Sequence, residues 1–252
     1  MNTYAGLHAR YYDVVYGEKA YVHEARFVDS LIRDSGTERG RLLDVACGTG
    51  RHAAEFASLG WDVTGVDLSD DLLEYARVNA PDARFLRQDM RSLDVPGELF
   101  DAVTCLFDAI GYAVDEDGVL ATLSAFARHL SPGGAVVIEF LHGPALRTSA
   151  APLRIRRFLL SSTGDELVRV SQTRLDEARS VMEVEFELLE LRADGTYERW
   201  LESQTNRYFA LEEMQGLLDG AGLNLQRFLP AYSDGDTIDE STFHVLAVAT
   251  IQ

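Results

Sequence analysis

The first half of the chain alternates between short apolar runs and longer stretches in which hydrophobic residues recur at helical spacing. Apolar runs bounded by glycine or polar residues predict buried strands, and the longer stretches predict helices that bury one face. The predicted strands cover residues 42–46, 62–66, 84–87, 101–106 and 134–140, and the predicted helices cover 51–59, 70–79 and 116–130. This alternation predicts an α/β domain with a parallel sheet and right-handed crossovers.

The hydrophobic spacing changes after residue 154. Residues 182–188 alternate between apolar and acidic side chains, which is the period of a strand with one face in water. Asp194 and Gly195 form a hairpin turn signal before the run 197–208, and residues 167–175 are a third candidate strand. We therefore predict an antiparallel sheet inserted after the fifth strand, which either covers the substrate or forms a homodimer contact.

The remaining segments flank these two sheets. Residues 1–35 predict helices, and several tyrosines crowd this stretch. Residues 211–221 form an amphipathic helical pattern that ends at glycine, and two last apolar runs, 223–229 and 243–251, predict strands. The expected organisation is a helical cap (1–40), a wound core (41–150), the inserted sheet (151–209) and a C-terminal helix with the last two strands (210–252).

The candidate chemistry begins at the first predicted strand. Asp44 lies inside this strand, and Gly48 and Gly50 follow in a turn before the helix that starts at Arg51. Glycines let the backbone turn tightly and let a ligand lie against the main chain. The first backbone N–H groups of the helix would face that ligand. The spacing also fits the dinucleotide pattern G-x-G-x-x-A, which is a weak signal by itself.

Carboxylates in or just after successive predicted strands distinguish two classes of ligand. A negative charge at Asp44 repels a pyrophosphate and attracts an ammonium and a sulfonium, which favours S-adenosylmethionine (SAM) over NAD. Asp67 follows the second strand, where a carboxylate can accept hydrogen bonds from both hydroxyls of a ribose. Asp89 follows the third strand and can accept from an adenine amino group, while Met90 covers the ring. In the alternative interpretation Asp44 is a solvated acid at a strand end.

The segments DVACGTG, GVDLS and QDM together resemble the class I SAM-dependent methyltransferases. The resemblance covers residues 42–140 and is much more specific than the glycines alone. It implies a Rossmann-like, seven-stranded, mostly parallel sheet whose last strand is antiparallel. It also implies SAM as the cofactor, with contacts at the matching positions Asp44, Ala46, Gly48, Gly50, Asp67, Leu68, Asp89, Met90 and Leu106.

The N-terminal tyrosines extend the resemblance to sugar N,N-dimethyltransferases of secondary metabolism. Their pattern has one tyrosine eight residues ahead of a Tyr-Asp pair, and Tyr4 ahead of Tyr12 and Asp13 reproduces it. The resemblance implies that Tyr4 approaches the substrate and that Tyr12 and Tyr21 border the cofactor. In the plain alternative these tyrosines pack a helix pair and keep their hydroxyls in water.

Candidate acceptor residues follow the fourth and fifth strands. Tyr112 stands where the sugar enzymes have a histidine or tyrosine after an Ile/Val-Gly pair, and it either bonds to the substrate or closes the pocket floor. His142 leaves the fifth strand and can take a proton, although a lone histidine is more often structural. Asp108 either binds a cationic acceptor or caps the next segment, and capping is the favoured interpretation.

Charge and cysteine content narrow the partners and the compartment. Over 252 residues the net charge is −18, which argues against binding to nucleic acid or to anionic membranes. Cys47 and Cys105 have neither C-x-x-C nor zinc-ligand spacing, so we expect a reducing, cytoplasmic compartment and no metal site. We expect no signal peptide and no membrane span, because no apolar run has the required pattern or length.

The absence of a convincing base in the sequence favours an amine as the methyl acceptor. A neutral amine needs no strong base, whereas a hydroxyl needs one. We therefore expect a SAM-dependent methyltransferase (EC 2.1.1.-) that acts on a small-molecule amine, and an amino sugar is the most specific form of this expectation. The acidic stretch AYSDGDTIDE near the end disfavours a nucleotide diphosphate. The alternatives are O-methylation of a small metabolite, SAM binding without methyl transfer, and an NAD-type oxidoreductase.

Overall fold

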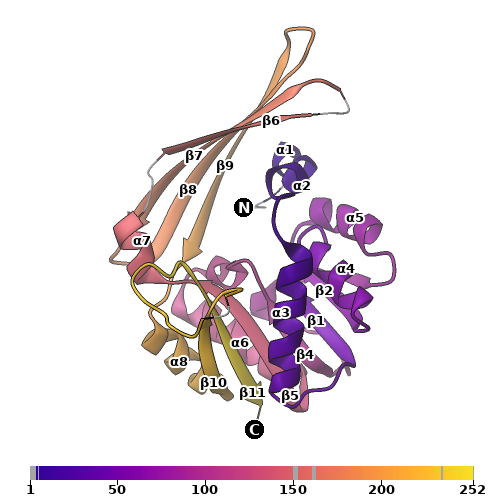
Figure 1. The fold of residues 1–252 in the computed structure, drawn as a ribbon, viewed down its shortest axis with the longest axis vertical. Coiled ribbons are helices and arrows are strands. Elements are labelled where there is room, and N and C mark those ends of the chain that lie inside the picture. Colours follow the sequence, from indigo (N-terminus) through magenta and orange to yellow (C-terminus); the bar gives the residue numbers. More distant parts are fainter. Residues whose placement is uncertain (1–3, 5, 150–152, 161–162, 234, 252) are drawn as a thin grey trace.

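The computed structural model describes residues 4, 6–149, 153–160, 163–233 and 235–251. These residues form a wound α/β core and a second sheet that extends from it (Figure 1). Both sheets contribute to the cavity described below, so their relation to one another decides the architecture of the site.

Within the described residues the core sheet has seven strands, in the order β10-β11-β5-β4-β1-β2-β3. Strands β1 to β5 pair in parallel, and β11 lies antiparallel between β5 and β10. The predicted Rossmann-like, mostly parallel sheet with one antiparallel strand is therefore confirmed. The bounds are Arg41–Val45 (β1), Asp62–Asp67 (β2), Arg84–Arg87 (β3), Phe100–Cys105 (β4), Leu130–Leu141 (β5), Leu223–Pro230 (β10) and His244–Ile251 (β11).

Helices cover both faces of this sheet. Helices α3, α4 and α5 share one apolar cluster with the strands, and α6 and α8 share a second cluster on the opposite face. Leu42 belongs to the first cluster and Leu43 to the second, and both are fully buried. Successive strand residues point to opposite faces of the sheet, and helices cover both faces. Polar side chains that bind a ligand are therefore confined to the ends of the strands. The bounds are Tyr21–Asp34 (α3), Arg51–Ser58 (α4), Asp70–Asn79 (α5), Glu116–His129 (α6) and Leu211–Gly220 (α8).

The second sheet is antiparallel and has the strand order β6-β7-β8-β9. The two short N-terminal helices lie between this sheet and the core (Figure 1). Val15 of α2 packs there in one apolar cluster with Phe186 and Leu188 of β8. Strand β9 is an edge strand of the sheet, so one of its sides is not paired within the sheet. The bounds are Gly6–Arg10 (α1), Tyr12–Val15 (α2), Leu153–Leu159 (β6), Glu166–Asp176 (β7), Val181–Leu191 (β8) and Tyr197–Arg207 (β9).

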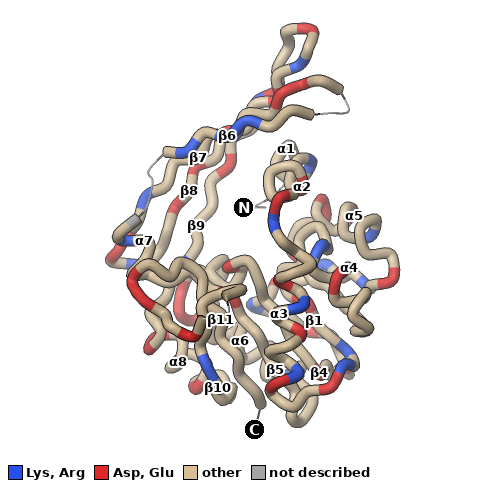
Figure 2. The backbone as a smooth tube through the Cα atoms, viewed as in Figure 1, with Lys and Arg blue, Asp and Glu red and all other residues tan. Residues whose placement is uncertain are grey.

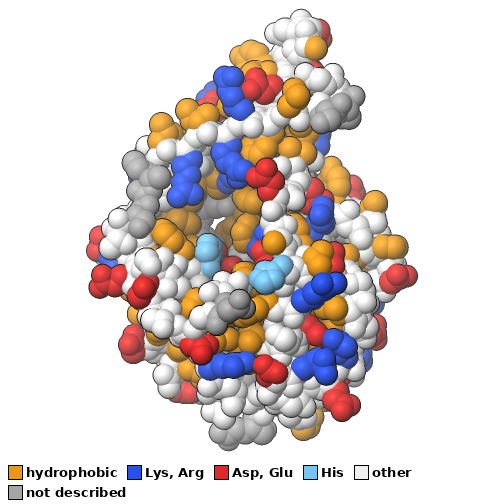
Figure 3. All heavy atoms as spheres, viewed as in Figure 1, with side chains coloured by type: hydrophobic (Ala, Val, Ile, Leu, Met, Phe, Trp, Pro, Cys, Tyr) orange, Lys and Arg blue, Asp and Glu red, His pale blue; other side chains and the backbone are white. Residues whose placement is uncertain are grey.

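The surface of the inserted sheet is densely charged but balanced. Acidic and basic residues are interleaved along its strands (Figure 2), and Arg199 pairs with Glu187 at 2.6 Å. The molecular surface is hollowed where the inserted sheet meets the core (Figure 3). Taken over the described residues, none of the helices combines the length and the apolar character needed to cross a membrane.

The structure differs from the predicted elements in three places. β6 is not predicted because its sequence, LRIRRFL, leaves both faces exposed and has no buried alternation. The short helices α7 (Gly143–Ser149), η1 (Met90–Ser92) and η2 (Ala109–Ala113) are too brief to show a helical period. β5 begins earlier than predicted, because its pairing with β4 jumps from Leu130 to Ala135 and includes the intervening turn as a bulge.

Candidate active site

The predicted carboxylates lie at the carboxyl edge of the core sheet. Asp44 of β1 is 3% exposed and lies between Gly65 of β2 and Thr104 of β4. The Thr104 hydroxyl donates to Asp44 Oδ1 at 2.9 Å, whereas Oδ2 is buried and has no hydrogen-bond partner among the described residues. Burial raises the pKa of Asp44 to about 6. A buried carboxylate oxygen without a donor favours a cationic ligand beside it.

The turn after β1 holds Asp67 in place. Ala46, Gly48 and Gly50 adopt positive φ angles of 57°, 56° and 74°. The backbone N–H groups of Gly48 and Ser69 donate to the two oxygens of Asp67, each at 2.9 Å. Burial raises the pKa of Asp67 in spite of these bonds. Each oxygen keeps a further lone pair, which suits the paired hydroxyls of a ribose.

The two glycines of this turn have different surroundings. A Cβ atom built on Gly48 would have only the Tyr12 hydroxyl nearby, at 3.9 Å, and Gly48 borders the cavity. A Cβ atom on Gly50 would lie 3.0 Å from the backbone of Ala76. Gly50 therefore permits close packing of α4 against α5, and among the described residues it lines neither of the two cavities discussed below.

A cavity of about 460 Å³ opens beside this edge. Its volume is typical of small-molecule sites, and its walls come from the core, the N-terminal segment and β9. Ser203 and Thr205 of β9 line it as well, and no sequence motif points to either residue. The predicted site residues in its lining are Tyr4, Tyr12, Ala46, Gly48, Asp67, Leu68, Asp89, Met90, Leu106 and Tyr112.

A smaller cavity of about 30 Å³ adjoins the first one and shares part of its lining. Asp44 and Tyr21 line it, together with Arg51 and His52 from the start of α4. This recess therefore places Asp44, with its unpaired oxygen, at one end of the combined site. Asp89 and Met90 line the larger cavity at the end of β3.

Asp89 is held in its ionised form by its neighbour. Arg91 donates to Asp89 from Nη2 at 2.6 Å and from Nε at 3.0 Å. These hydrogen bonds lower the pKa of Asp89. A carboxylate has about four lone-pair sites, so Asp89 can still accept from an amino group in the cavity.

The two predicted acceptor tyrosines meet at the large cavity. The hydroxyl oxygens of Tyr4 and Tyr112 are 2.7 Å apart, and Tyr112 donates to Gln204 Oε1 at 3.1 Å. Tyr12 packs edge-on against Tyr4, with ring centroids 5.4 Å apart. Burial raises the pKa of both Tyr4 and Tyr112, so both hydroxyls stay protonated at neutral pH. Hydroxyls buried at a cavity wall differ from the solvated tyrosines of the plain alternative.

His142 lies apart from this group. Its side chain is largely buried, and its Nδ1 atom lies 3.0 Å from the carbonyl oxygen of Thr242. Its backbone forms a bridge to Phe209. His142 lines neither cavity within the described part of the chain, and this geometry favours its structural interpretation over a role in proton transfer.

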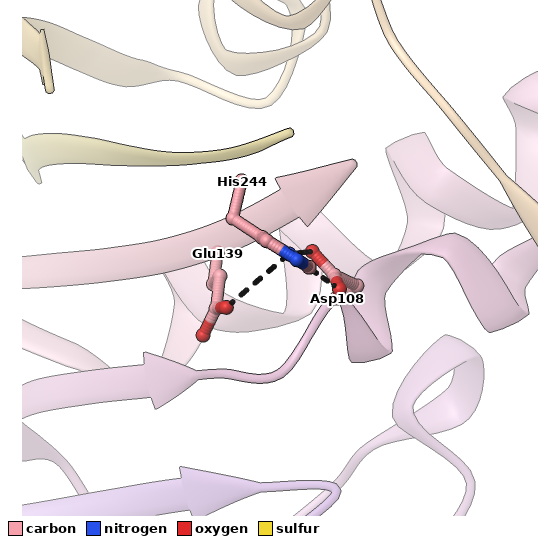
Figure 4. Close-up of side chains that lie close together, drawn as sticks. All are labelled: Asp108, Glu139 and His244. Atoms are coloured by element: carbon pink, nitrogen blue, oxygen red, sulfur yellow. Dashed lines mark hydrogen bonds and ion pairs between the residues drawn. The ribbon is translucent and has the colours of Figure 1, made fainter. Parts of the chain in front are cut away.

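Asp108 does not cap the segment that follows it, so the favoured interpretation of this residue is wrong. Its side chain accepts no capping hydrogen bond. The carboxylate instead pairs with His244 Nδ1 at 2.9 Å, and Glu139 Oε1 lies 3.7 Å from the same nitrogen (Figure 4). Burial acts against the charged imidazole, but Asp108 and Glu139 together raise the pKa of His244 to about 9.

These three residues, here called the His244 cluster, support a wall of the site. Their potential ligand atoms lie within 4.8 Å of one another, and the imidazole already supplies a positive charge between the two carboxylates. Glu139 Oε2 also accepts from the backbone N–H of Phe107 at 2.7 Å and from the Tyr232 hydroxyl at 2.5 Å. Because Phe107 lines both cavities, the cluster positions a residue of the site.

Comparisons with known proteins agree with this geometry. A family model described as a methyltransferase domain matches residues 42–134. The dTDP-3-amino-3,6-dideoxy-alpha-D-glucopyranose N,N-dimethyltransferase of Streptomyces fradiae is 33% identical over 234 residues, which cover 92% of this chain and 89% of that protein. The dTDP-3-amino-3,4,6-trideoxy-alpha-D-glucopyranose N,N-dimethyltransferase of Streptomyces venezuelae is 41% identical over 134 residues, a match that spans 52% of this chain and 56% of that protein.

A solved structure extends the match to the whole fold. It is an amino pentose methyltransferase from Micromonospora echinaspora with SAM bound, and it aligns with 28% identity and a TM-score of 0.77. The alignment covers 100% of this chain and 99% of that one. With the carboxylates and the glycine turn at the same edge of the same sheet, the chain belongs to the class I SAM-dependent methyltransferases.

Proposed function

We propose that this methyltransferase transfers the methyl group of SAM to the neutral amine of a small molecule, and that the acceptor is an amino sugar. The relatives from Streptomyces fradiae and Streptomyces venezuelae are named as N,N-dimethyltransferases of amino sugars, and the structure from Micromonospora echinaspora is named as an amino pentose methyltransferase. These names support the acceptor class for this chain. The lining of the cavity independently supports the coarser statement that the acceptor is an amine.

The observation that carries the proposal is the lack of a suitable base at the cavity. Of the described residues that line it, none is a histidine, lysine, glutamate or cysteine, and its two carboxylates, Asp67 and Asp89, lie on the side proposed for SAM. Burial raises the pKa values of Tyr4 and Tyr112, so neither hydroxyl accepts a proton from a substrate hydroxyl at neutral pH. Attack by a hydroxyl requires such a base, whereas a neutral amine already has a free lone pair.

The residues at the sheet edge fit SAM by their chemistry. Asp44, with its buried and unpaired oxygen, would lie near the positively charged methionine part. Asp67 would accept from the ribose hydroxyls, and Asp89 from the adenine amino group. Tyr12 and Ala46 would form part of the walls, and Met90 would lie against the adenine ring. Leu68 and Leu106 would lie beside that ring. Tyr21 would border the smaller cavity.

The chain would accelerate the reaction mainly by positioning. Bound SAM supplies a methyl carbon on a positively charged sulfur, which is already reactive toward an amine. Tyr4 and Tyr112 would hold the amine beside that carbon, and β9 with the N-terminal segment would exclude water. The proton left on the product would pass to water, because the carboxylates of the described lining, Asp67 and Asp89, would already be bound to the ribose and the adenine.

A phosphate-bearing part of the acceptor would find little support inside the cavity. Arg91 supplies the cation among the described lining residues, and its guanidinium is already bound to Asp89. We therefore propose that the amine-bearing ring enters the cavity and that any diphosphate remains outside it.

The proposal is tested by incubating the purified protein with SAM and a panel of acceptors. The panel contains free amino sugars, their nucleotide diphosphates, simple ring amines, phenols and carboxylic acids, and products are identified by mass spectrometry. We expect methylated amines, and a heat-treated sample serves as the control. Methylation confined to hydroxyl or carboxyl groups would show that the amine assignment is wrong.

A further inference from the structure

Four side chains link the inserted sheet to the large cavity through a series of hydrogen bonds, and we call this series the Glu202 chain. Gln204 Nε2 donates to Glu202 Oε1 at 2.7 Å, and the Tyr112 hydroxyl donates to Gln204 Oε1 at 3.1 Å. The hydroxyl oxygens of Tyr112 and Tyr4 are 2.7 Å apart. Residues from the N-terminal segment, from η2 and from β9 therefore meet in one network.

Glu202 determines the direction of the first hydrogen bond. Its side chain is 8% exposed, His8 Nδ1 lies 3.3 Å from Oε2, and the backbone N–H of Tyr4 donates to Oε1 at 3.0 Å. Burial opposes ionisation, but the nearby His8 imidazole and the backbone N–H of Tyr4 prevail and lower the pKa of Glu202. An ionised carboxylate can only accept. The amide nitrogen of Gln204 must therefore face Glu202, and its oxygen must face Tyr112.

The direction of each later bond follows from this one. Because Gln204 Oε1 is an acceptor, the hydroxyl hydrogen of Tyr112 points to Gln204. Two hydroxyl oxygens at 2.7 Å need a hydrogen between them, and Tyr112 has already used its own. Tyr4 must therefore donate to Tyr112. The Tyr4 oxygen then has only lone pairs left for a ligand in the cavity.

We propose that the Glu202 chain makes the Tyr4 hydroxyl a hydrogen-bond acceptor toward the cavity, so that the site selects a nucleophile with a hydrogen on its attacking atom. Primary and secondary amines meet this requirement. When such an amine donates an N–H to Tyr4, its lone pair points away from the hydroxyl and remains free to react. An ether, a carbonyl or a neutral tertiary amine has no hydrogen to donate and leaves the Tyr4 oxygen unpaired, at a cost in free energy.

This inference rests on the proposed function. The requirement for an N–H on the acceptor also limits the number of methyl groups transferred. In each round the amine nitrogen bonds through its lone pair to the methyl carbon, and the carbon–sulfur bond breaks with its electrons left on sulfur. The nitrogen becomes positively charged and then loses a hydrogen ion to water. A primary amine can pass through two rounds, and the neutral dimethylated product has no N–H left. We therefore expect the reaction to stop at the tertiary amine.

Two substitutions at Gln204 distinguish an effect on hydrogen-bond direction from an effect on side-chain packing. Gln204→Met keeps a similar length but removes the acceptor, so Tyr112 can donate to Tyr4 and Tyr4 can donate into the cavity. Gln204→Glu keeps an acceptor oxygen toward Tyr112, because a buried carboxyl beside Glu202 holds a proton and shares it with that carboxylate. For the amine that the wild type methylates, Gln204→Met should lower kcat by about tenfold or more, the scale of one hydrogen bond. Its KM and its SAM affinity should stay near those of the wild type.

In contrast, Gln204→Glu should retain most of the wild-type kcat. A purely structural role for Gln204 would raise KM and weaken SAM binding in both variants, because both disturb the same contact. Equal losses of kcat in the two variants would overturn the proposal. Tyr112→Phe is a second way to release the Tyr4 hydrogen if Gln204→Met does not fold.

A binding measurement tests the chain separately from the proposed function. The protein is saturated with S-adenosylhomocysteine, the demethylated product of SAM, and titrated by NMR with cyclohexanol, a hydrogen donor, and with methoxycyclohexane, which only accepts. The preference for cyclohexanol should fall by about fivefold or more in Gln204→Met and Tyr112→Phe, as expected for one neutral hydrogen bond, and persist in Gln204→Glu. An unchanged ratio in all variants would refute the direction of the chain. An enzyme that shows the ratio change but methylates no amine would refute only the proposed function.

Discussion

The two sides of the large cavity are assembled in different ways. On the proposed SAM side, polar groups come from short segments at the ends of neighbouring parallel strands, and Asp44 and Asp67 are its central charges. On the proposed acceptor side, Tyr4 bonds to Glu202 from 198 positions away, and Tyr112 bonds to Gln204 across 92 positions. The carboxylates of the SAM side therefore need only the strand order of the core sheet, whereas the acceptor side exists only when the N-terminal segment and the inserted sheet have docked.

The two sides also differ in how they use charge. The SAM side presents carboxylates directly to the cavity. The acceptor side presents hydroxyls, and its carboxylate, Glu202, lies behind Gln204 and Tyr112. On the SAM side, carboxylates would attract a positively charged ligand. On the acceptor side, the direction of the hydrogen bonds would orient a neutral ligand. Substitutions on each side should therefore change different measurable quantities.

The largest effect is expected on the acceptor side. Tyr4→Phe and Tyr112→Phe remove the hydroxyls that orient the amine, and misplacement of a reactant can cost on the order of 100-fold in rate. We expect kcat to fall by about 10- to 100-fold in each variant, with SAM affinity within about twofold, because no charge is lost on the SAM side. Steady-state kinetics and calorimetry measure the two quantities.

Tyr75→Phe is the matched control for these variants, because Tyr75 is 38% exposed on α5 and lines neither cavity. It should leave both quantities unchanged. A loss of SAM affinity as large as the loss of turnover at Tyr4 or Tyr112 would mean that the two sides of the cavity are not separable.

The next largest effect is expected at Asp67, on the SAM side, where SAM affinity should fall instead of kcat. Asp67→Ala removes the acceptor of the Gly48 and Ser69 backbone N–H groups and of the proposed ribose bonds. SAM binding should weaken by about 1–3 kcal/mol, the scale of lost hydrogen bonds to a charged group. Calorimetry on Asp67→Ala, with exposed Asp82→Ala as the matched control, measures the effect. An unchanged affinity in a folded Asp67→Ala variant would remove this residue from the site.

The same difference explains what the sequence could predict. Asp44 lies inside a predicted strand, Asp67 and Asp89 follow predicted strands, and parallel strands deliver their carboxyl ends to one edge. Glu202 and Gln204 lie in a predicted strand whose two faces carry similar polar residues. The sequence of this strand does not say which face is buried, because the docked N-terminal segment decides it.

The two histidines at the carboxyl edge of the core sheet show the same limit of sequence-based prediction. The sequence indicates His142 as the candidate because it follows the fifth predicted strand. β11 runs antiparallel, so its first residue, His244, pairs with Leu141 at the same edge. His244 forms the ion pair there, and His142 does not line the cavity within the described residues. The predicted cap at Asp108 failed for the same reason, since its partner comes from more than 100 positions away.

A third prediction concerns pH on the SAM side. Burial raises the pKa of Asp44 to about 6, and a cation beside it favours the ionised form. SAM binding should therefore release a proton below that pH, and affinity should fall by up to about tenfold per pH unit as the pH drops below 6. Calorimetry between pH 5 and 8 measures this dependence. Asp44→Asn should bind SAM weakly with a flatter profile, and a profile as steep as that of the wild type would assign the titration to another group.

The smallest effect is expected where the two sides of the cavity join, at the His244 cluster. The backbone oxygen of Asp108 accepts from Asn206 of β9, and Glu139 holds the backbone of Phe107. The carboxylates raise the pKa of His244 to about 9, so its charge stabilises the fold below the unfolded-state pKa of about 6.5. This contribution should decline as the pH rises through 9. His244→Gln should therefore destabilise the protein at pH 6 by about 1 kcal/mol, a modest value because the imidazole is 44% exposed to water.

Denaturant unfolding at pH 6 and pH 10 gives the comparison, and exposed His23→Gln is the matched control because it lacks a carboxylate partner in the described ion pairs. The destabilisation by His244→Gln should be clear at pH 6 and largely absent at pH 10. Because the cluster anchors Phe107 and, through Asp108, the end of β9, the same variant should change SAM affinity and turnover by similar small factors. A loss confined to either quantity would place the cluster on one side of the cavity rather than at the junction between the two.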